Sequence, residues 1–371
     1  MMVPNWMRQI FLLVLALLTV GGGAALATET VSLYRISVPV ESESSSQRRA
    51  AASDALAQVF VKVAGQSAVL QQYPALQDFL PQASRRVVSY RYHYRQPAAP
   101  APDDETLAHE EPIGSESLFI EFEFQPSFVE QSLRQAGAPV WQARRPVVMS
   151  WVVVERGGER NFLSLSALAD SQHVLARASA DRGLPLRQPL LDLEEVMQVE
   201  VDDVWNFEFE MLAPASQRYA STALLVGRVS QSWSGEWFGR WQFQHDDVSE
   251  SVRYRGGDLA EWLASGVDLA AESLAARFAV SGSAPVGAQR WSLGVSGIES
   301  PGDYTAVTKH LRELAVLENL RLARVEGDSA IYHFDTAAAP QQLEALLLLD
   351  KRMRLGSGFP GGPMLNFDWR P

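Results

Sequence analysis

The feature that most constrains this fold is the apolar run Val147-Val-Met-Ser-Trp-Val-Val-Val154 in the middle of the chain. Eight nearly unbroken apolar residues, most of them β-branched, are typical of a strand that is buried on both faces. Pro146 fits the first position of such a strand, where no backbone donor is needed. A strand of this kind needs a covering layer on each side, so the sequence predicts an α/β domain around it.

Composition bounds the number of domains and the classes of partner. A chain of 371 residues has room for roughly two to three domains, and 47% hydrophobic residues are ordinary for a protein with buried cores. The net charge of −12 disfavours nucleic acid, whose affinity comes from clustered lysine and arginine. It equally disfavours an anionic membrane surface. We therefore expect no nucleic-acid partner.

Residues 1–27 have the features of a secretory signal peptide. Arg8 supplies a positive charge, 10–20 is an apolar stretch, and Ala25-Leu-Ala27 is a small-x-small cleavage site before Thr28. The alternative is an uncleaved anchor helix, but the apolar stretch is short for a membrane span. We predict cleavage, export to the periplasm and a soluble mature protein with no stable membrane insertion.

The absence of cysteine narrows the chemistry further. A chain with no cysteine forms no disulfide, has no catalytic thiolate and offers no cysteine ligands to zinc. It also lacks the cysteine that carries the lipid of a bacterial lipoprotein. The sequence thus predicts a protein held together by packing alone.

An N-terminal β-α-β-β-α domain is predicted over 28–137. Its expected elements are strand 31–38, helix 47–64, strands 87–95 and 118–124, and helix 126–136. The loop 96–114 is rich in proline and acids and is expected to be the most mobile interior segment. His109 lies among those acids, but a solvated loop is favoured over a metal site because nothing there holds ligand geometry.

A central three-layer α/β domain is predicted over 138–280, since strands and helices interleave there. Asp192 begins a helical turn, with Glu195 at capping-box spacing. The acids that follow could indicate a calcium or magnesium site, but acids in a first helical turn more often cap the helix, and no metal is assigned. A tryptophan-rich hairpin lies between 233 and 245, and a long helix starts at Asp258.

A C-terminal domain is predicted over 288–355, after a linker rich in glycine and serine at 281–287. Its order of elements, β-α-β-β-α-β, is that of the ferredoxin-like split βαβ fold. Residues 356–371 are expected to be a C-terminal tail. The predicted class for the whole chain is therefore mixed α/β (α+β), with three domains.

No catalytic motif is present: there is no G-x-S-x-G, P-loop, H-E-x-x-H or G-x-G-x-x-G at a strand–helix joint. We assign no catalytic residue and no cofactor. The candidate binding residues are the arginines, the acid and the tryptophans at the ends of predicted elements, namely Trp141, Arg144, Arg145, Asp192, Arg218, Trp233 and Trp237. For the arginines we favour an ion pair that closes the domain edge, with an acid such as Asp192. For the tryptophans we favour packing over stacking on sugars.

Several segments resemble a proteobacterial family known as domain of unknown function 2066. They are Leu33-Tyr-Arg-Ile-Ser-Val-Pro-Val, 49–65, Ala136-Gly-Ala-Pro-Val-Trp-Gln-Ala-Arg-Arg-Pro, Arg182-Gly-Leu-Pro-Leu with Pro189-Leu-Leu-Asp-Leu, Ser216-Gln-Arg-Tyr, Leu225-Val-Gly-Arg-Val, and Trp237 with Trp241. The organisation also resembles periplasmic flagellar-ring proteins and envelope proteins that share the amino-terminal domain of the Tol-system propeller protein. The first family has no established activity, so it supplies no catalytic residues. The second resemblance implies an α/β domain that binds other envelope proteins.

Two functions follow as hypotheses. The first is a non-enzymatic periplasmic accessory or adaptor protein, whose middle domain binds another envelope component. The alternative is a cell-wall glycan-binding protein or hydrolase that uses the tryptophan-rich hairpin and the edge arginines. The alternative predicts that Trp233, Trp237, Arg145 and Asp192 line one deep pocket.

Overall fold

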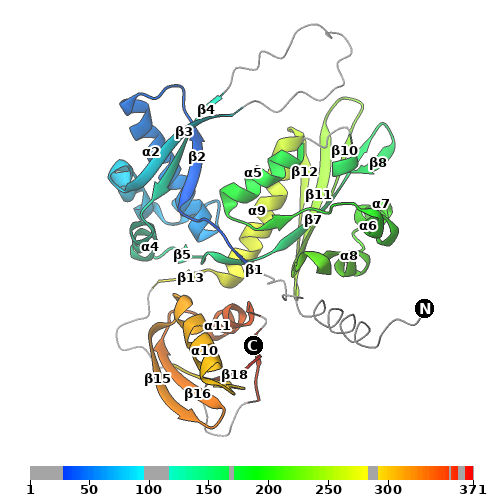
Figure 1. Cartoon of the computed structure of the whole chain (residues 1–371). Coiled ribbons are helices and arrows are strands. Elements are labelled where there is room, and N and C mark those ends of the chain that lie inside the picture. Colours follow the sequence, from blue (N-terminus) through cyan, green and yellow to red (C-terminus); the bar gives the residue numbers. More distant parts are fainter. Residues whose placement is uncertain are drawn as a thin grey trace, which may run out of the picture.

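The computed structural model describes residues 28–95, 117–166, 171–282, 291–350, 352–357 and 364–370. Three units follow one another along the chain (Figure 1). The predicted mixed α/β class is confirmed, because helices and several sheets alternate throughout the described ranges. The predicted signal peptide 1–27 and the loop 96–114 lie outside the described residues.

The N-terminal unit is a three-stranded antiparallel sheet covered by helix α2. The sheet has the order β2-β4-β3. The elements are β2 (Arg35–Pro39), α2 (Ser45–Ala64), α3 (Val69–Gln72), the 3-10 segment η1 (Pro74–Arg85), β3 (Val87–Arg95), β4 (Ser117–Phe124) and α4 (Pro126–Gln135). Ser44 caps the start of α2, and Gly65 ends it at φ +76°, a conformation that suits glycine. The predicted element order holds; α3 and η1 are additional.

The central unit is a mixed six-stranded sheet with the path β12-β11-β10-β7-β8 and with β9 beside β7. Its strands are β7 (Val148–Arg156), β8 (Glu159–Phe162), β9 (Leu186–Arg187), β10 (Ala223–Gln231), β11 (Trp237–His245) and β12 (Val248–Arg255). Its helices are α5 (Gln172–Arg182), α6 (Leu193–Gln198), α7 (Val201–Asn206), α8 (Phe209–Ser216) and α9 (Leu259–Phe278), with 3-10 turns η2 (Leu163–Leu165) and η4 (Gln217–Tyr219).

Strand β7 is buried on both faces, as its sequence predicts. Val148, Val152 and Val154 belong to the core beneath α9, whereas Met149, Trp151 and Val153 belong to a separate core beneath α7 and α8. Alternate side chains of a strand point to opposite faces, so one apolar run serves two layers. Figure 1 shows α5 and α9 on one side of this sheet and α6, α7 and α8 on the other.

The C-terminal unit has the predicted element order but a different sheet. Its elements are β14 (Trp291–Ser296), α10 (Pro301–Glu313), β15 (Glu318–Glu326), β16 (Ser329–Asp335), α11 (Pro340–Leu348), β17 (Met353–Leu355) and β18 (Leu365–Trp369). The sheet order is β15-β16-β14-β18-β17. Strand β18 therefore lies between the first and last strands of the expected split βαβ unit, parallel to β14 and antiparallel to β17.

The prediction of a C-terminal tail over 356–371 is consequently wrong. Phe367 and Trp369 alternate with polar residues along β18, and both are buried in the domain core. A five-residue segment with two large apolar side chains on one face is more stable inside the sheet than in water. Its shortness and its Gly/Pro-rich approach concealed it in the sequence.

Two small strand pairs connect the units. β1 (Thr28–Thr30) pairs with β6 (Arg144–Pro146), and β5 (Pro139–Val140) pairs with β13 (Val280–Ser281). The predicted boundaries at 137 and 280 thus fall at places where strands from different units pair. Within the described ranges, every helix is too short or too polar to cross a bilayer.

Candidate functional site

Arg145 is fully buried and donates hydrogen bonds only to backbone carbonyls. Its Nε donates to the carbonyl of Gln142 at 3.1 Å. Its Nη1 donates to Arg182 and Gly183, each at 2.9 Å. Its Nη2 donates to Lys62 at 2.8 Å and to Trp141 at 3.2 Å. Burial, and secondarily the charge of Arg182, lowers the pKa of Arg145 to about 9, so it remains a cation at neutral pH.

Three of these carbonyls, those of Lys62, Arg182 and Gly183, lie where two helices end. Lys62 is in the last turn of α2, and Arg182 is the last residue of α5. The final carbonyls of a helix lack intrahelical partners and carry the negative end of the helix dipole, so a cation is well placed there. Arg182 adds a hydrogen bond of 2.9 Å from its Nη2 to the carbonyl of Gly65. The two arginines therefore join the N-terminal and central units.

The predicted binding roles of Arg145 and Trp141 need correction. Both side chains are 0% exposed, so neither reaches a ligand in this conformation. Contrary to the expected ion pair with Asp192, Arg145 has no acid partner among the described residues, because five carbonyls satisfy its donors. Its role in the structure is to hold two units together.

Arg144 faces the opposite way, toward the C-terminal unit. Its Nη2 lies 3.4 Å from a carboxylate oxygen of Asp350, and its Nη1 lies 3.3 Å from Nδ1 of His310. Asp350 is fully buried and also accepts hydrogen bonds from Arg352. Burial lowers the pKa of His310. Adjacent residues of β6 thus fasten the central unit to its two neighbours.

Asp192 and Arg218 form the ion pair of a third cluster, on the side of the central sheet covered by α6 to α8. Nη2 of Arg218 lies 2.8 Å from one oxygen of Asp192, and Nη1 donates to the other at 3.1 Å. The hydrogen bond from Arg218 is the main cause that lowers the pKa of Asp192. Asp192 also caps α6 by accepting from the backbone of Glu195 at 3.1 Å, as predicted.

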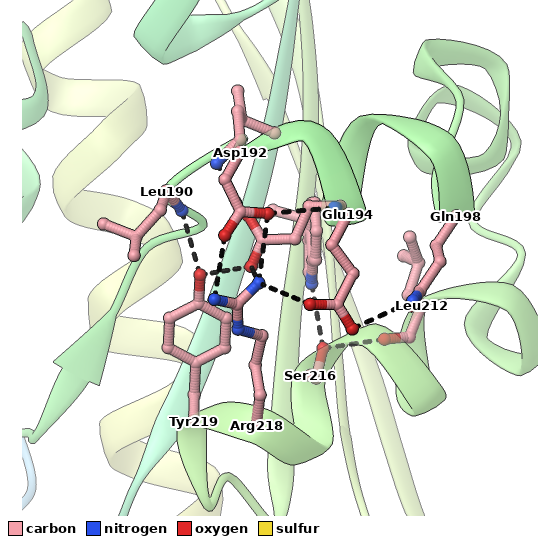
Figure 2. Close-up of polar contacts among 11 residues, drawn as sticks. Leu190, Asp192, Glu194, Gln198, Leu212, Ser216, Arg218 and Tyr219 are labelled. Atoms are coloured by element: carbon pink, nitrogen blue, oxygen red, sulfur yellow. Dashed lines mark hydrogen bonds and ion pairs between the residues drawn. The ribbon is translucent and has the colours of Figure 1, made fainter. Parts of the chain in front are cut away.

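Figure 2 shows Arg218 and Tyr219 pointing from η4 toward Asp192 and the turn at Leu190. The hydroxyl of Tyr219 donates to the buried carboxylate of Glu195 and accepts from the backbone of Leu190 at 2.9 Å. Leu191, which has a positive φ of 51°, donates from its backbone to the same carboxylate. The carboxylates of Asp192 and Glu195 and the guanidinium of Arg218 pair with one another, so we call the arrangement a closed structural network.

The tryptophans of the hairpin are separated. Trp233 is fully exposed in the turn between β10 and β11, whereas Trp237 is 8% exposed and belongs to the core beneath α9. Trp141 and Arg145 are buried elsewhere, and Asp192 lies in the closed network. The deep pocket that the glycan hypothesis requires is not formed by these residues in the described part of the chain.

The structure instead brings together a row of arginines that the sequence analysis missed. Arg228 on β10 lies directly opposite Arg240 on β11, and Arg240 lies directly opposite Arg253 on β12. Arg255 follows two residues after Arg253 and therefore points to the same face of the sheet. We call these four residues the arginine row. They line a shallow hollow of about 490 Å³ together with Trp205 and Phe238.

Aromatic rings lie between these guanidinium groups. Arg228 is 5.3 Å from the ring of Trp205 and 5.1 Å from that of Phe207. Arg240 is 5.4 Å from the same Phe207 ring. Arg255 is 5.5 Å from the ring of Phe238. Stacking on aromatic faces positions the arginine side chains and leaves part of their hydrogen-bonding capacity free.

The arginine row is short of negative charge. Arg240, Arg253 and Arg255 form no ion pair with any described residue, and no acid lines the hollow. The Nε of Arg240 is buried without a hydrogen-bond partner among the described atoms. Burial, followed by the charges of Arg240 and Arg160, lowers the pKa of Arg228. Like charges placed directly opposite on neighbouring strands destabilise a sheet, so an anion bound here would be stabilising.

The common alternative is a solvated sheet edge. Charged residues on an edge strand prevent aggregation, and arginines on aromatic rings support packing. Those roles account for Arg253 and Arg255, which are on the terminal strand. They do not account for Arg240, whose neighbours across both adjacent strands are arginines.

A larger hollow, of about 850 Å³, lies between β2 and α5. Its lining mixes cations with acids, among them Arg35, Lys62, Glu121 and Asp181. With Arg177 the lining holds three cations and two acids, so most of the positive charge there is offset. No described group of three or more histidines or acids is arranged to hold a metal ion.

The comparisons with known proteins give a family without a function. A family model described as a domain of unknown function (DUF8605) matches residues 27–142, which is less than half of the chain. The search of curated proteins found no match. The matched model differs from the domain of unknown function 2066 that the sequence motifs resemble, so that resemblance stays a prediction.

Proposed function

We propose that this chain is an exported accessory protein of the cell envelope that binds another envelope component and performs no catalysis. The binding surface is the arginine row, on the same side of the central sheet as α6 to α8. The observation that carries the proposal is the alignment of Arg228, Arg240 and Arg253 across three strands, in a protein whose net charge is −12. No acid lines their hollow, and Arg240 and Arg253 form no ion pair among the described residues.

The periplasmic location rests on the N-terminal sequence, with its apolar stretch and Ala25-Leu-Ala27 site. A negatively charged protein that concentrates cations on one face directs that face toward negatively charged partners. The buried contacts of Arg145 and Arg144 support this role, because they hold three units in one arrangement and keep the face in a constant position.

The test is capture of partners from periplasmic extract by tagged protein. The double variant Arg240→Glu/Arg253→Glu reverses two charges of the arginine row. The matched control is Arg321→Glu, which reverses an exposed arginine on the edge strand β15 of the C-terminal unit, opposite His333. We expect the double variant to lose at least one component that both the wild type and the control retain.

Equal melting temperatures of the three proteins exclude unfolding as the cause of the loss. If the double variant captures the same components as the wild type, the arginine row is not the binding surface. The alternative function, a glycan-binding protein or hydrolase, depends on residues that the structure separates, and wild-type binding to isolated cell-wall glycan would favour it.

A further inference from the structure

The arginine row continues to an unpaired strand edge. β12 is the last strand of the central sheet and pairs, among the described residues, only with β11. The outer edge of such a strand presents backbone donors and acceptors to which a further strand can pair. Arg253 and Arg255 are exposed on this strand and have no ion pair within the described chain.

We infer that the partner contributes an extended acidic segment, which adds to β12 as a further strand and places alternate carboxylates beside Arg253 and Arg255. This inference rests on the proposed function and names the kind of partner that its binding surface takes. The occupant is a polypeptide rather than another polyanion because the cations lie along a strand edge that can hydrogen-bond a backbone.

The spacing of the row supports a strand as the occupant. Neighbouring strands lie about 4.8 Å apart, and alternate side chains of one strand are separated by roughly 6.7 Å. A strand beside β12 would therefore present one side chain to Arg253 and the side chain two residues away to Arg255. Carboxylates at both positions would form charge-assisted hydrogen bonds with the two guanidinium groups.

The side chains on the opposite face of β12 determine which partner residues are favoured between the two acids. Val252 and Tyr254 point toward α9 and are partly buried against the core. Tyr254 is held there by its hydroxyl, which donates to Glu261 at 2.8 Å. A neighbouring strand would lay its intervening side chains beside these two residues, where apolar groups are favoured. The expected partner sequence thus alternates acidic and apolar residues.

The first half of β12 has neutral side chains on the face that carries Arg253 and Arg255. Ser249 and Ser251 precede Arg253 at alternate positions. The cationic part of the edge therefore covers only one end of the strand. A partner segment with acids throughout would gain little over one with two correctly spaced acids, and this separates strand pairing from general attraction to negative charge.

The experiment measures binding of a fluorescent ten-residue peptide, with alternating glutamate and valine, to the full chain by anisotropy. Three comparison ligands have the same charge: a scrambled peptide with its glutamates adjacent, the alternating peptide N-methylated at every second amide, and a single-stranded oligonucleotide. We expect the alternating peptide to bind about tenfold more tightly than the scrambled and methylated peptides, which corresponds to about 1.4 kcal/mol.

Variants locate the site. Arg253→Gln/Arg255→Gln should weaken binding of the alternating peptide by about tenfold or more, whereas Arg321→Gln should leave it unchanged. Hydrogen exchange of the wild type with saturating alternating peptide should show slower exchange confined to 248–255. Both variants should stay folded and melt close to the wild type, because Arg253 and Arg255 are exposed and the described contact that is lost is that of Arg255 with the ring of Phe238.

Equal affinity for the alternating and scrambled peptides would overturn the inference, since strand pairing would then contribute nothing. Tighter binding of the oligonucleotide would also overturn it, in favour of a general polyanion surface. If the peptide fails to bind while capture from extract still depends on Arg240 and Arg253, this inference fails and the proposed function stands. If that capture is also independent of the arginines, both fail.

Discussion

The guanidinium of Arg145 lies 3.8 Å above the ring of Trp141, and both side chains are completely buried. The indole face offers a cation a favourable surface that requires no hydrogen bond, and the five N–H groups remain directed at backbone carbonyls. The backbone of Trp141 in turn donates to the carbonyl of Val63 at 2.8 Å. Together these two residues of the central unit donate hydrogen bonds to the last carbonyls of α2.

Replacing Arg145 by alanine should lower the free energy of unfolding by about 3–5 kcal/mol, because five carbonyls lose a charged donor in a buried place. Arg145→Lys should recover only part of this loss, since one ammonium cannot reach both helix ends. Urea unfolding of these variants and of Arg321→Ala, an exposed control, tests the prediction. Unchanged unfolding of Arg145→Ala would show that the carbonyls find other donors.

Acid should weaken the attachment of the C-terminal unit through Asp350. Burial by itself raises the pKa of this carboxyl, but the hydrogen bonds from Arg352 and the charges of His310 and Arg352 together lower it to about 2. The folded pKa is below the ordinary value of 3.8, so the ionised group stabilises the fold fully above about pH 4. That contribution is lost as the pH falls through about 2.

The variant Asp350→Asn isolates this contribution. At pH 7 it should be less stable than the wild type, and the difference should shrink as the pH falls from 4 toward 2. Urea unfolding at a series of pH values measures the difference. If the difference in unfolding free energy between the two proteins stays constant down to pH 2, the stability comes from packing of Asp350 rather than from its charge.

The C-terminal unit should fold by itself only if strand β18 is included. A fragment 288–355 lacks the strand between β14 and β17, together with the buried side chains of Phe367 and Trp369. We expect a dispersed NMR spectrum from 288–371 and a poorly dispersed one from 288–355. In the full chain, Phe367→Ala should cost about 3–5 kcal/mol. A well-dispersed spectrum from 288–355 would show that β18 is dispensable.

Replacing Gly266 by alanine should lower the stability of the protein, whereas the same change at an ordinary helical glycine raises it. Alanine in a helix is usually about 1 kcal/mol more stable than glycine. At Gly266 in α9, however, a Cβ would collide with the ring of Trp241, which stacks on Trp262 at 4.4 Å between centroids. We expect Gly266→Ala to destabilise the protein by about 1–3 kcal/mol, as overpacking does.

The control is Gly302→Ala, in the first turn of α10. A Cβ there meets only Ser300 Oγ at 3.4 Å, an ordinary contact, so this variant should be neutral or more stable. Thermal melts of both variants test whether Gly266→Ala lowers the melting temperature while Gly302→Ala does not. If Gly266→Ala melts at or above the wild-type temperature, the tryptophan stack is able to shift.

Local pattern was sufficient for much of the fold. The nearly unbroken apolar run 147–154 predicted a strand buried on both faces. The sequence also placed the end of α2 at Gly65 and the cap of α6 at Asp192, as the structure has them. These features depend on neighbours within a few residues, where hydrogen bonding and side-chain period are determined by the chain itself. The order of the main elements of the N-terminal unit, and of β14 to β17 in the C-terminal unit, followed for the same reason.

The sequence by itself determined the class of this protein, the order of most of its elements, and the helix ends at Gly65 and Asp192. Tertiary structure decided the rest, because the decisive partners are distant in the chain: Arg145 finds its acceptors at Lys62 and Arg182, and Arg144 finds Asp350. Strand register alone places Arg228, Arg240 and Arg253 in one row. The position of β18 between β14 and β17 decides the strand order of the C-terminal sheet. Such pairings are determined by the packing of whole elements. The free energy gained by burying those elements is larger than the local conformational preference of any single segment.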